Sequence, residues 1–166
     1  MILIALGANL PSFAGPPART LKYALGKLGG KGMQIRGVSS FYETPAWPDP
    51  RQPAFVNAVA AVHTIIQPVE LLAILHGVET ELGRMRSAPN ASRTLDLDLL
   101  DYDGRVMRKE LVLPHPRMTD RSFVLVPLAE IAPDWHHPIS GKGIQELLEA
   151  LSDKDTPRRL DPQDLL

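Results

Sequence analysis

Hydrophobic and acidic residues alternate strictly along one stretch of the chain, LDLDL at 95–99. This period-two pattern predicts a strand with two unlike faces, because successive side chains of a strand point in opposite directions. We therefore expect a strand within residues 93–102 whose leucines face a hydrophobic core. Asp96 and Asp98 would then stand together on the other face, roughly 6.6 Å apart along the strand.

The same kind of pattern predicts the other elements of the fold. Apolar, β-branched runs favour strands over 2–6, 33–42 and 55–66. Apolar residues at helical spacing predict helices over 18–28, 69–83 (with Pro68 as the first residue), 122–131 (interrupted by Pro127) and 144–151. Proline-rich or polar stretches predict loops over 10–17, 43–53 and 84–92, and Asp103-Gly104 predicts a hairpin turn after the acidic strand.

The resulting order, β-α-β-β-α-β with helices after it, predicts the fold class. Two βαβ halves of this kind favour an α+β, ferredoxin-like antiparallel sheet with packed helices and C-terminal helical additions. We expect one domain over residues 1–151. Residues 152–166 are polar and contain proline, so a poorly ordered tail is expected there.

Composition narrows the class of protein. A chain of 166 residues fits one domain, and its net charge of -1 argues against a chain-wide affinity for nucleic acid or membranes. Cysteine is absent, which excludes disulfides and cysteine-bound zinc. Residues 2–6 are too short for a secretion signal and no apolar run could cross a membrane, so we expect a cytoplasmic protein.

The acidic pair lies between two groups of basic residues. Arg84, Arg86 and Arg93 precede it, and His115, Arg117 and Arg121 follow it. Neither a P-loop nor a Rossmann glycine motif is present, so phosphates would have to be held by metal ions and cationic side chains. The pattern favours a magnesium-assisted phosphate site. The alternative is an amphipathic strand whose acids simply face water.

A second group of residues suits a flat nitrogen heterocycle. Phe55 and Asn57 share one face of a strand and offer a ring for stacking and an amide that donates and accepts. Thr44 and Trp47 could extend the same pocket, and Phe123 could close its other side. Aromatic residues are also common in cores, which is the alternative. Glu79, on the second helix, either reaches the site or faces solvent.

Six segments together resemble the family of 6-hydroxymethyl-7,8-dihydropterin pyrophosphokinases. The matching segments are ALGANL at 5–10, SSFYETPAW at 39–47, QPAFVNA at 52–58, ELGRMR at 81–86, RTLDLDLL at 93–100 and LPHPRMTDRSFVLVPLAEIAP at 113–133. They cover most of the chain in the order of the family. The resemblance implies a ferredoxin-like fold and transfer of diphosphate from ATP to the pterin hydroxymethyl group, with release of AMP, in folate biosynthesis.

The resemblance also implies a role for each candidate residue. Asp96 and Asp98 would bind two magnesium ions, Arg84 and Arg93 would be catalytic arginines that contact ATP, and Arg86 would be a weaker phosphate contact. Glu79, His115 and Arg121 match positions near ATP. Phe55 and Phe123 match the aromatic pair that sandwiches the pterin, and Thr44, Pro45, Trp47 and Asn57 match the rest of its pocket.

The chain departs from the family in the loop over 87–92, where a tryptophan that packs over the pterin is absent. We expect a monomer whose partners are the small molecules ATP and the pterin, with no nucleic acid and no membrane. Two other functions fit the residues without the resemblance. One is a non-catalytic ferredoxin-like module that binds nucleotide or RNA, which would display basic and aromatic residues rather than acids on its sheet. The other is a magnesium-dependent nucleotidyltransferase, which would release pyrophosphate.

Overall fold

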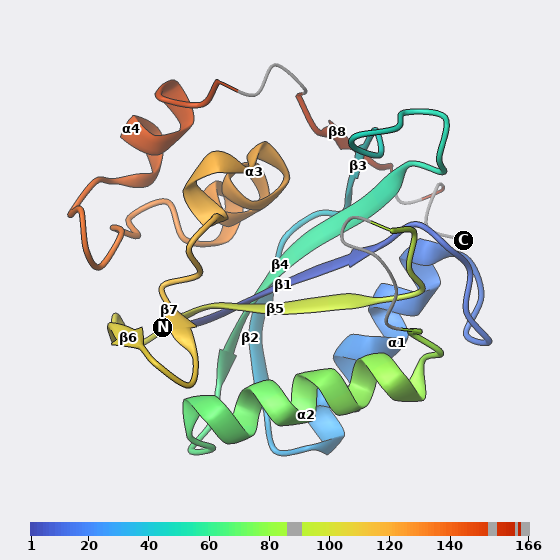
Figure 1. Cartoon of the computed structure of the whole chain (residues 1–166), viewed down its shortest axis with the longest axis horizontal. Helices are drawn as coiled ribbons and strands as arrows, with labels where there is room; N and C mark the ends of the chain where they lie inside the picture. The colour runs from blue at the N-terminus through green and yellow to red at the C-terminus, as the bar shows by residue number, and fades with distance from the viewer. Residues whose placement is uncertain (86–90, 153–155, 162, 164–166) are drawn as a thin grey trace.

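The computed structural model describes residues 1–85, 91–152, 156–161 and 163. Its centre is an antiparallel sheet of six strands in the order β5-β1-β4-β3-β8, with β2 also paired to β4 (Figure 1). The strands are β1 (Ile2–Ala8), β2 (Gln34–Val38), β3 (Tyr42–Thr44), β4 (Phe55–His63), β5 (Asp96–Tyr102) and β8 (Arg158–Arg159). A separate hairpin joins β6 (Met107–Arg108) to β7 (Val112–Leu113).

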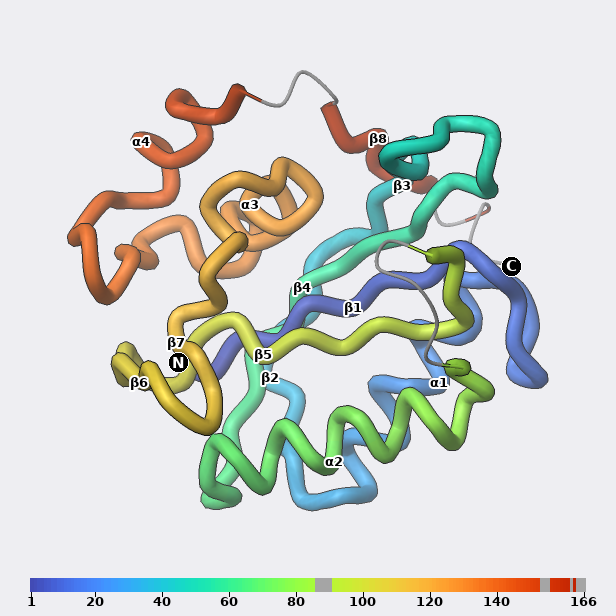
Figure 2. Tube along the Cα trace, viewed as in Figure 1, coloured from blue at the N-terminus to red at the C-terminus, as the bar shows by residue number. Residues whose placement is uncertain are grey.

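Helices cover both faces of this sheet (Figures 1 and 2). They are α1 (Pro17–Gly30), α2 (Pro68–Glu81), α3 (Ser122–Ile131) and α4 (Ile144–Glu149), with a 3-10 turn, η1, at Met118–Asp120. The order β1-α1-β2/β3-β4-α2-β5 and the antiparallel pairing confirm the predicted ferredoxin-like fold. No helix among the described residues is both long and apolar enough to cross a membrane.

Strand alternation divides the interior into two cores. Leu6 of β1, Ala58 of β4 and Leu97 of β5 lie in the larger core, beneath α1 and α2. Leu3, Val59 and their neighbours face the opposite way and pack under α3 and α4. Because α3 covers only part of this second face, the rest of it is open to form a site.

The acidic strand has the predicted alternation, with its leucines buried in the larger core. A bulge interrupts its pairing with β1, since Ile4 pairs with Leu99 whereas Leu3 pairs with Asp101. The skipped Leu100 packs under α3, on the face opposite Leu99. The predicted hairpin after β5 is wrong. The chain does turn after the strand, but the residues beyond pair within the β6–β7 hairpin and β5 itself pairs with β1.

The single strand expected over 33–42 is two strands, β2 and β3, both paired with β4. Between them the Ser39 amide still donates to the Val59 carbonyl, but the Val59 amide donates to the Ser39 hydroxyl instead of a backbone carbonyl. The loop expected over 43–53 therefore starts too early, as Glu43 and Thr44 belong to β3. Helix α3 has the predicted bounds but runs through Pro127 without interruption.

The expectation of a poorly ordered tail after residue 151 is wrong for residues 156–160. Arg158 and Arg159 form β8, which pairs with β3, and the Leu160 side chain is buried in the larger core. The strand signal was missed because β8 has only two residues, and both are exposed arginines.

Candidate active site

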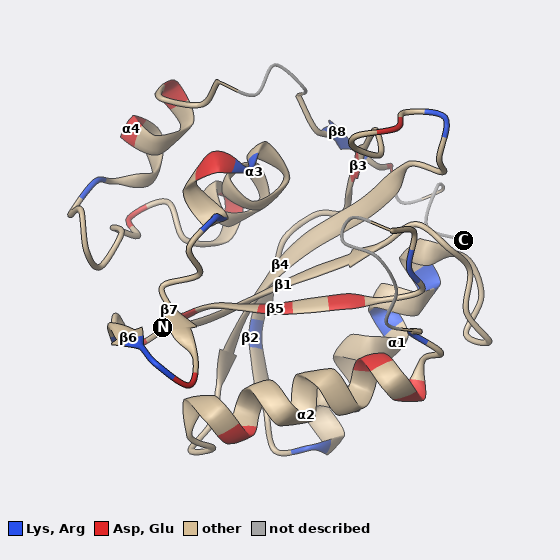
Figure 3. Cartoon of the chain, viewed as in Figure 1, with Lys and Arg blue, Asp and Glu red and all other residues tan. Residues whose placement is uncertain are grey.

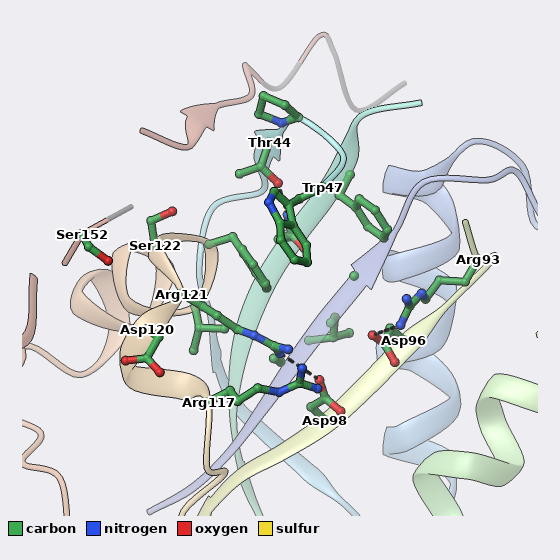
Figure 4. A pocket seen from close by; sticks show the side chains of 18 residues that line it. Thr44, Trp47, Arg93, Asp96, Asp98, Arg117, Asp120, Arg121, Ser122 and Ser152 are labelled. Carbon is green, nitrogen blue, oxygen red and sulfur yellow. Dashed lines mark hydrogen bonds and ion pairs between the residues drawn. The ribbon is translucent and has the colours of Figure 1, made fainter. Parts of the chain in front are cut away.

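A pocket of about 570 Å³ opens on the part of the second sheet face that α3 leaves uncovered (Figure 4). Ten of the candidate residues line it: Thr44, Pro45, Trp47, Phe55, Asn57, Arg93, Asp96, Asp98, Arg121 and Phe123. Arg117, which the sequence placed in the basic group after the acidic strand, lines it as well. Sequence reasoning did not include seven others: Ala5, Leu6, Gly7, Asp120, Ser122, Val124 and Ser152. The structure thus brings residues from six separate segments of the chain into one cavity.

The pocket floor depends on the register of three neighbouring strands. Gly7 of β1 lies between Asn57 of β4 and Asp96 of β5. A Cβ atom added at Gly7 would stand 3.0 Å from the Asn57 Oδ1 atom. The missing side chain therefore lets the Asn57 amide lie close against the floor, next to the acidic strand.

Asp96 is paired with two arginines. Its Oδ1 atom lies 2.5 Å from the Nη1 atom of Arg84, and its Oδ2 atom lies 2.7 Å from that of Arg93. These bonds compensate the charge of Asp96 and gather both arginines at its carboxylate. Figure 3 shows the acidic positions along β5 and basic positions in the segments around that strand.

Asp98 is less well compensated than Asp96. Its ion pair with Arg121 is long, at 3.9 Å between Nη1 and Oδ2, although Arg117 and Arg121 both point towards it (Figure 4). Burial and the nearby negative charge of Asp96 raise the pKa of Asp98. A carboxylate in this setting gains from any further positive charge, whether from a metal ion or from a basic group.

Glu79 of α2 is buried, with only 2 % of its surface exposed, and does not line the pocket. Its Oε1 atom accepts a hydrogen bond from the Leu97 amide at 2.7 Å and also binds the Arg84 guanidinium. Burial raises the pKa of Glu79 to about 7, although the Leu97 amide and Arg84 favour its charged form. Glu79 therefore binds a backbone amide of β5 and holds Arg84. The alternative of a solvent-facing side chain is wrong.

Aromatic residues form the other end of the pocket. Phe55 of β4 and Phe123 of α3 both line it, while Trp47 in the preceding loop is 72 % exposed. The Asn57 side-chain amide donates to the Thr44 hydroxyl at 2.8 Å, which fixes both polar groups on one wall. None of these rings belongs to the larger core, whereas Phe123 also packs against the second core. All three line the same cavity as the aspartates.

Two arginines connect the aromatic and acidic ends. The guanidinium carbon of Arg93 lies 5.9 Å from the centre of the Phe55 ring, and that of Arg121 lies 5.4 Å from the centre of the Phe123 ring. Both distances are within the range of cation–π contacts. A ligand between the rings would therefore extend directly towards the arginine and aspartate groups.

Among the described candidate residues, Arg84 and His115 do not line this cavity, and neither does Glu79. Arg84 binds the lining residue Asp96, and the His115 amide donates to the Leu100 carbonyl at 2.8 Å. Burial, together with the charges of Arg121 and Arg117, lowers the pKa of His115. Arg86 is outside the described residues.

Asn9 is a supporting residue that sequence reasoning missed. Its side-chain amide donates to the Pro53 carbonyl and the Ser92 hydroxyl, each at 3.0 Å. Its Oδ1 atom accepts from the Arg93 amide at 2.8 Å. Asn9 is buried and directly follows β1, and a polar residue at that point was the available signal.

The carboxylates of the pocket can be compared with the ligands that magnesium requires. No cluster of three or more histidine, aspartate or glutamate residues that could hold a metal occurs in the described part of the chain. Magnesium, however, is often bound by only one or two carboxylates and takes its other ligands from water and phosphate. Asp96 and Asp98, with Asp98 short of positive charge, fit such an ion.

Comparisons with known proteins agree on one family. The family model described as 7,8-dihydro-6-hydroxymethylpterin-pyrophosphokinase matches residues 3–133. A Synechocystis protein named 2-amino-4-hydroxy-6-hydroxymethyldihydropteridine pyrophosphokinase is 41% identical over 89% of this chain and 74% of its own length. A Haemophilus influenzae protein of the same name is 40% identical over 90% of this chain and 92% of its own length.

A solved structure is similar in fold. The crystal structure of Plasmodium falciparum HPPK-DHPS matches 89% of this chain with a TM-score of 0.69 and 15% sequence identity. This chain spans only 40% of that longer chain. At this identity the likeness concerns the fold alone.

Proposed function

The chain belongs to the 7,8-dihydro-6-hydroxymethylpterin-pyrophosphokinase family, and on this basis we propose that it transfers diphosphate from ATP to 6-hydroxymethyl-7,8-dihydropterin. The pterin hydroxymethyl oxygen would attack the β-phosphorus of ATP. The bond from that phosphorus to the α-phosphate oxygen would break, which releases AMP and forms the pterin diphosphate used in folate biosynthesis.

One observation carries the proposal. A pair of aromatic rings and a pair of carboxylates share one cavity, and Arg93 contacts both an aromatic ring and Asp96. The reaction needs such an arrangement, because a flat heterocycle and a triphosphate must meet with the hydroxymethyl group at the phosphorus.

The aromatic end suits the pterin. Phe55 and Phe123 would stack on the two faces of its ring, as offset ring pairs commonly do. Thr44 and Asn57 would bind the polar ring edge, since the Thr44 hydroxyl accepts from Asn57 and retains its own hydrogen for donation. Pro45 and Trp47 would complete the wall.

The charged end suits the phosphates. Arg84, Arg93 and Arg121 would bind phosphate oxygens and stabilise the charge that develops on them during transfer. Arg86 and His115 are further proposed ATP contacts, and Glu79 would act by holding Arg84. Asp96 and Asp98 would hold two magnesium ions, which when bound neutralise phosphate charge and lower the pKa of the attacking hydroxyl.

The oligomeric state of the enzyme and its location in the cell are also proposals. We propose that the chain acts as a monomer. We also propose a cytoplasmic location. Size-exclusion chromatography with light scattering would test the first expectation.

Nucleotide product analysis tests the reaction directly. The chain is incubated with ATP and magnesium, with and without 6-hydroxymethyl-7,8-dihydropterin. We expect AMP to form only with the pterin, in equal amount to the pterin diphosphate. Release of pyrophosphate would instead identify a nucleotidyltransferase, and absence of turnover would support a non-catalytic binding module. Either result would overturn the proposal.

A further inference from the structure

Strand β8 pairs with β3 on the side away from β4, so β3 lies between two strands (Figures 1 and 2). Arg158 pairs with Glu43 and Arg159 pairs with Tyr42 in the ladder. The Arg158 guanidinium also donates two hydrogen bonds to the Glu43 Oε1 atom, at 3.0 and 3.3 Å. Just beyond the strand, the Leu160 amide donates to the Phe41 carbonyl at 2.8 Å.

This contact matters because β3 ends in the pocket wall. Thr44 is the last residue of β3, and it holds the Asn57 amide through its hydroxyl. With only three residues, β3 makes few ladder bonds to β4. Because β3 has only three paired positions with β4, the two positions paired with β8 and the Leu160 bond are a substantial part of what holds it.

A second set of contacts links the same strand to α3. The Tyr42 hydroxyl donates to Glu130 Oε2 at 2.9 Å, and the Ser40 hydroxyl donates to Oε1 at 2.8 Å. The Arg159 Nη2 atom lies 3.9 Å from the same Glu130 carboxylate. Glu130 belongs to α3, which also carries Phe123 in the opposite pocket wall.

We infer that β8 is a positioning element for substrate binding: by clamping β3 and supporting the Glu130 contacts, it sets Thr44 and Phe123 across the pocket. This inference rests on the proposed pterin reaction. The contacts of β8 given above are with β3 and α3, whereas Asp96 and Asp98 stand on β5, across the sheet. A disturbance of β8 should therefore weaken pterin binding more than ATP binding.

A charge swap tests this inference with the full chain. Arg158→Glu places two acidic side chains opposite each other, which is unfavourable in a strand pair. Because the lost pair is exposed, the pterin KM should rise by about fivefold while kcat and the ATP KM stay within about twofold. Glu43→Arg/Arg158→Glu should restore the pterin KM. Arg36→Glu, the same change on an exposed residue of β2, should have no effect.

Two further readouts separate positioning from general stability. Amide exchange over residues 42–44 and 55–57 should become faster in Arg158→Glu and recover in the charge swap. If β8 were merely structural, a smaller active fraction would lower kcat and leave the pterin KM unchanged. That result, or a double variant that fails to recover, would overturn the inference.

Pterin binding measured by calorimetry distinguishes failure of this inference from failure of the proposed reaction. The proposed reaction fails if the wild-type chain forms no pterin-dependent AMP, whatever the variants do. The positioning inference fails if Arg158→Glu and the wild type bind the pterin equally well, or if the wild type does not bind it.

Discussion

The guanidinium of Arg93 lies 5.9 Å from the centre of the Phe55 ring. The same guanidinium binds Asp96, so one side chain joins the aromatic and the acidic halves of the pocket. This link orders the two halves relative to each other. It also means that a change in the aromatic wall can affect the phosphate end.

Phe55→Ala should raise the pterin KM by about tenfold, because it removes both a stacking surface and the ring beneath Arg93. Phe55→Tyr keeps the ring and should stay near the wild-type value. Phe13→Ala is the matched control, since Phe13 is 71% exposed and does not line the pocket. Steady-state kinetics with each substrate varied in turn measure the effect. Equal pterin KM values for Phe55→Ala and wild type would contradict the stacking role.

Asp98→Asn should lower turnover by about a hundredfold or more, because it removes a charge that would hold magnesium against the phosphates. It should also abolish the rise in melting temperature that magnesium and ATP together give the wild type. The exposed Asp134→Asn serves as the control. Calorimetric melting curves give a readout independent of activity, and an unchanged magnesium effect in Asp98→Asn would argue against a metal role.

Gly7→Ala should raise the pterin KM by roughly tenfold, because the new methyl group would crowd the Asn57 amide and such overpacking costs 1–3 kcal/mol. The close approach of 3.0 Å to Asn57 Oδ1 is the reason. Gly37→Ala, in β2, meets nothing within 4 Å and should be tolerated. Kinetics and melting curves of the two variants should differ; similar behaviour would show that the floor adjusts easily.

Glu79 should make stability depend on pH. Its pKa is raised from 4.5 to about 7 in the folded protein, so the folded state binds the proton more tightly than the unfolded chain between these values. The resulting stabilisation is fully present below the lower value and is lost as the pH rises through the higher one.

Denaturant unfolding of the wild type and of Glu79→Gln measures this dependence. Between about pH 5 and about pH 8, the free energy of unfolding should fall more for the wild type than for Glu79→Gln, which cannot ionise. Glu149→Gln, an exposed change on α4, is the control and should follow the wild type. Parallel curves for the wild type and Glu79→Gln would exclude the raised pKa.

Local patterns in the sequence predicted much of this fold. Alternation over 95–99 was enough to place the leucines in the core and the aspartates on the opposite face, because strand geometry alone determines which side chains share a face. Apolar residues at helical spacing likewise located α1, α2 and α3, because helix geometry determines which side chains share a face. The aromatic and amide residues on β4 were also placed on one face by their spacing.

Contacts between distant segments decided the rest. Strand register made Gly7 the floor beneath Asn57, and a buried carboxylate from α2 holds Arg84 at the edge of β5. A two-residue strand near the end of the chain supports β3. None of these three features has a local signature, because each depends on which backbone groups meet after the sheet has formed. Local periodicity thus determined the faces of the elements, and tertiary packing decided which side chains meet in the pocket.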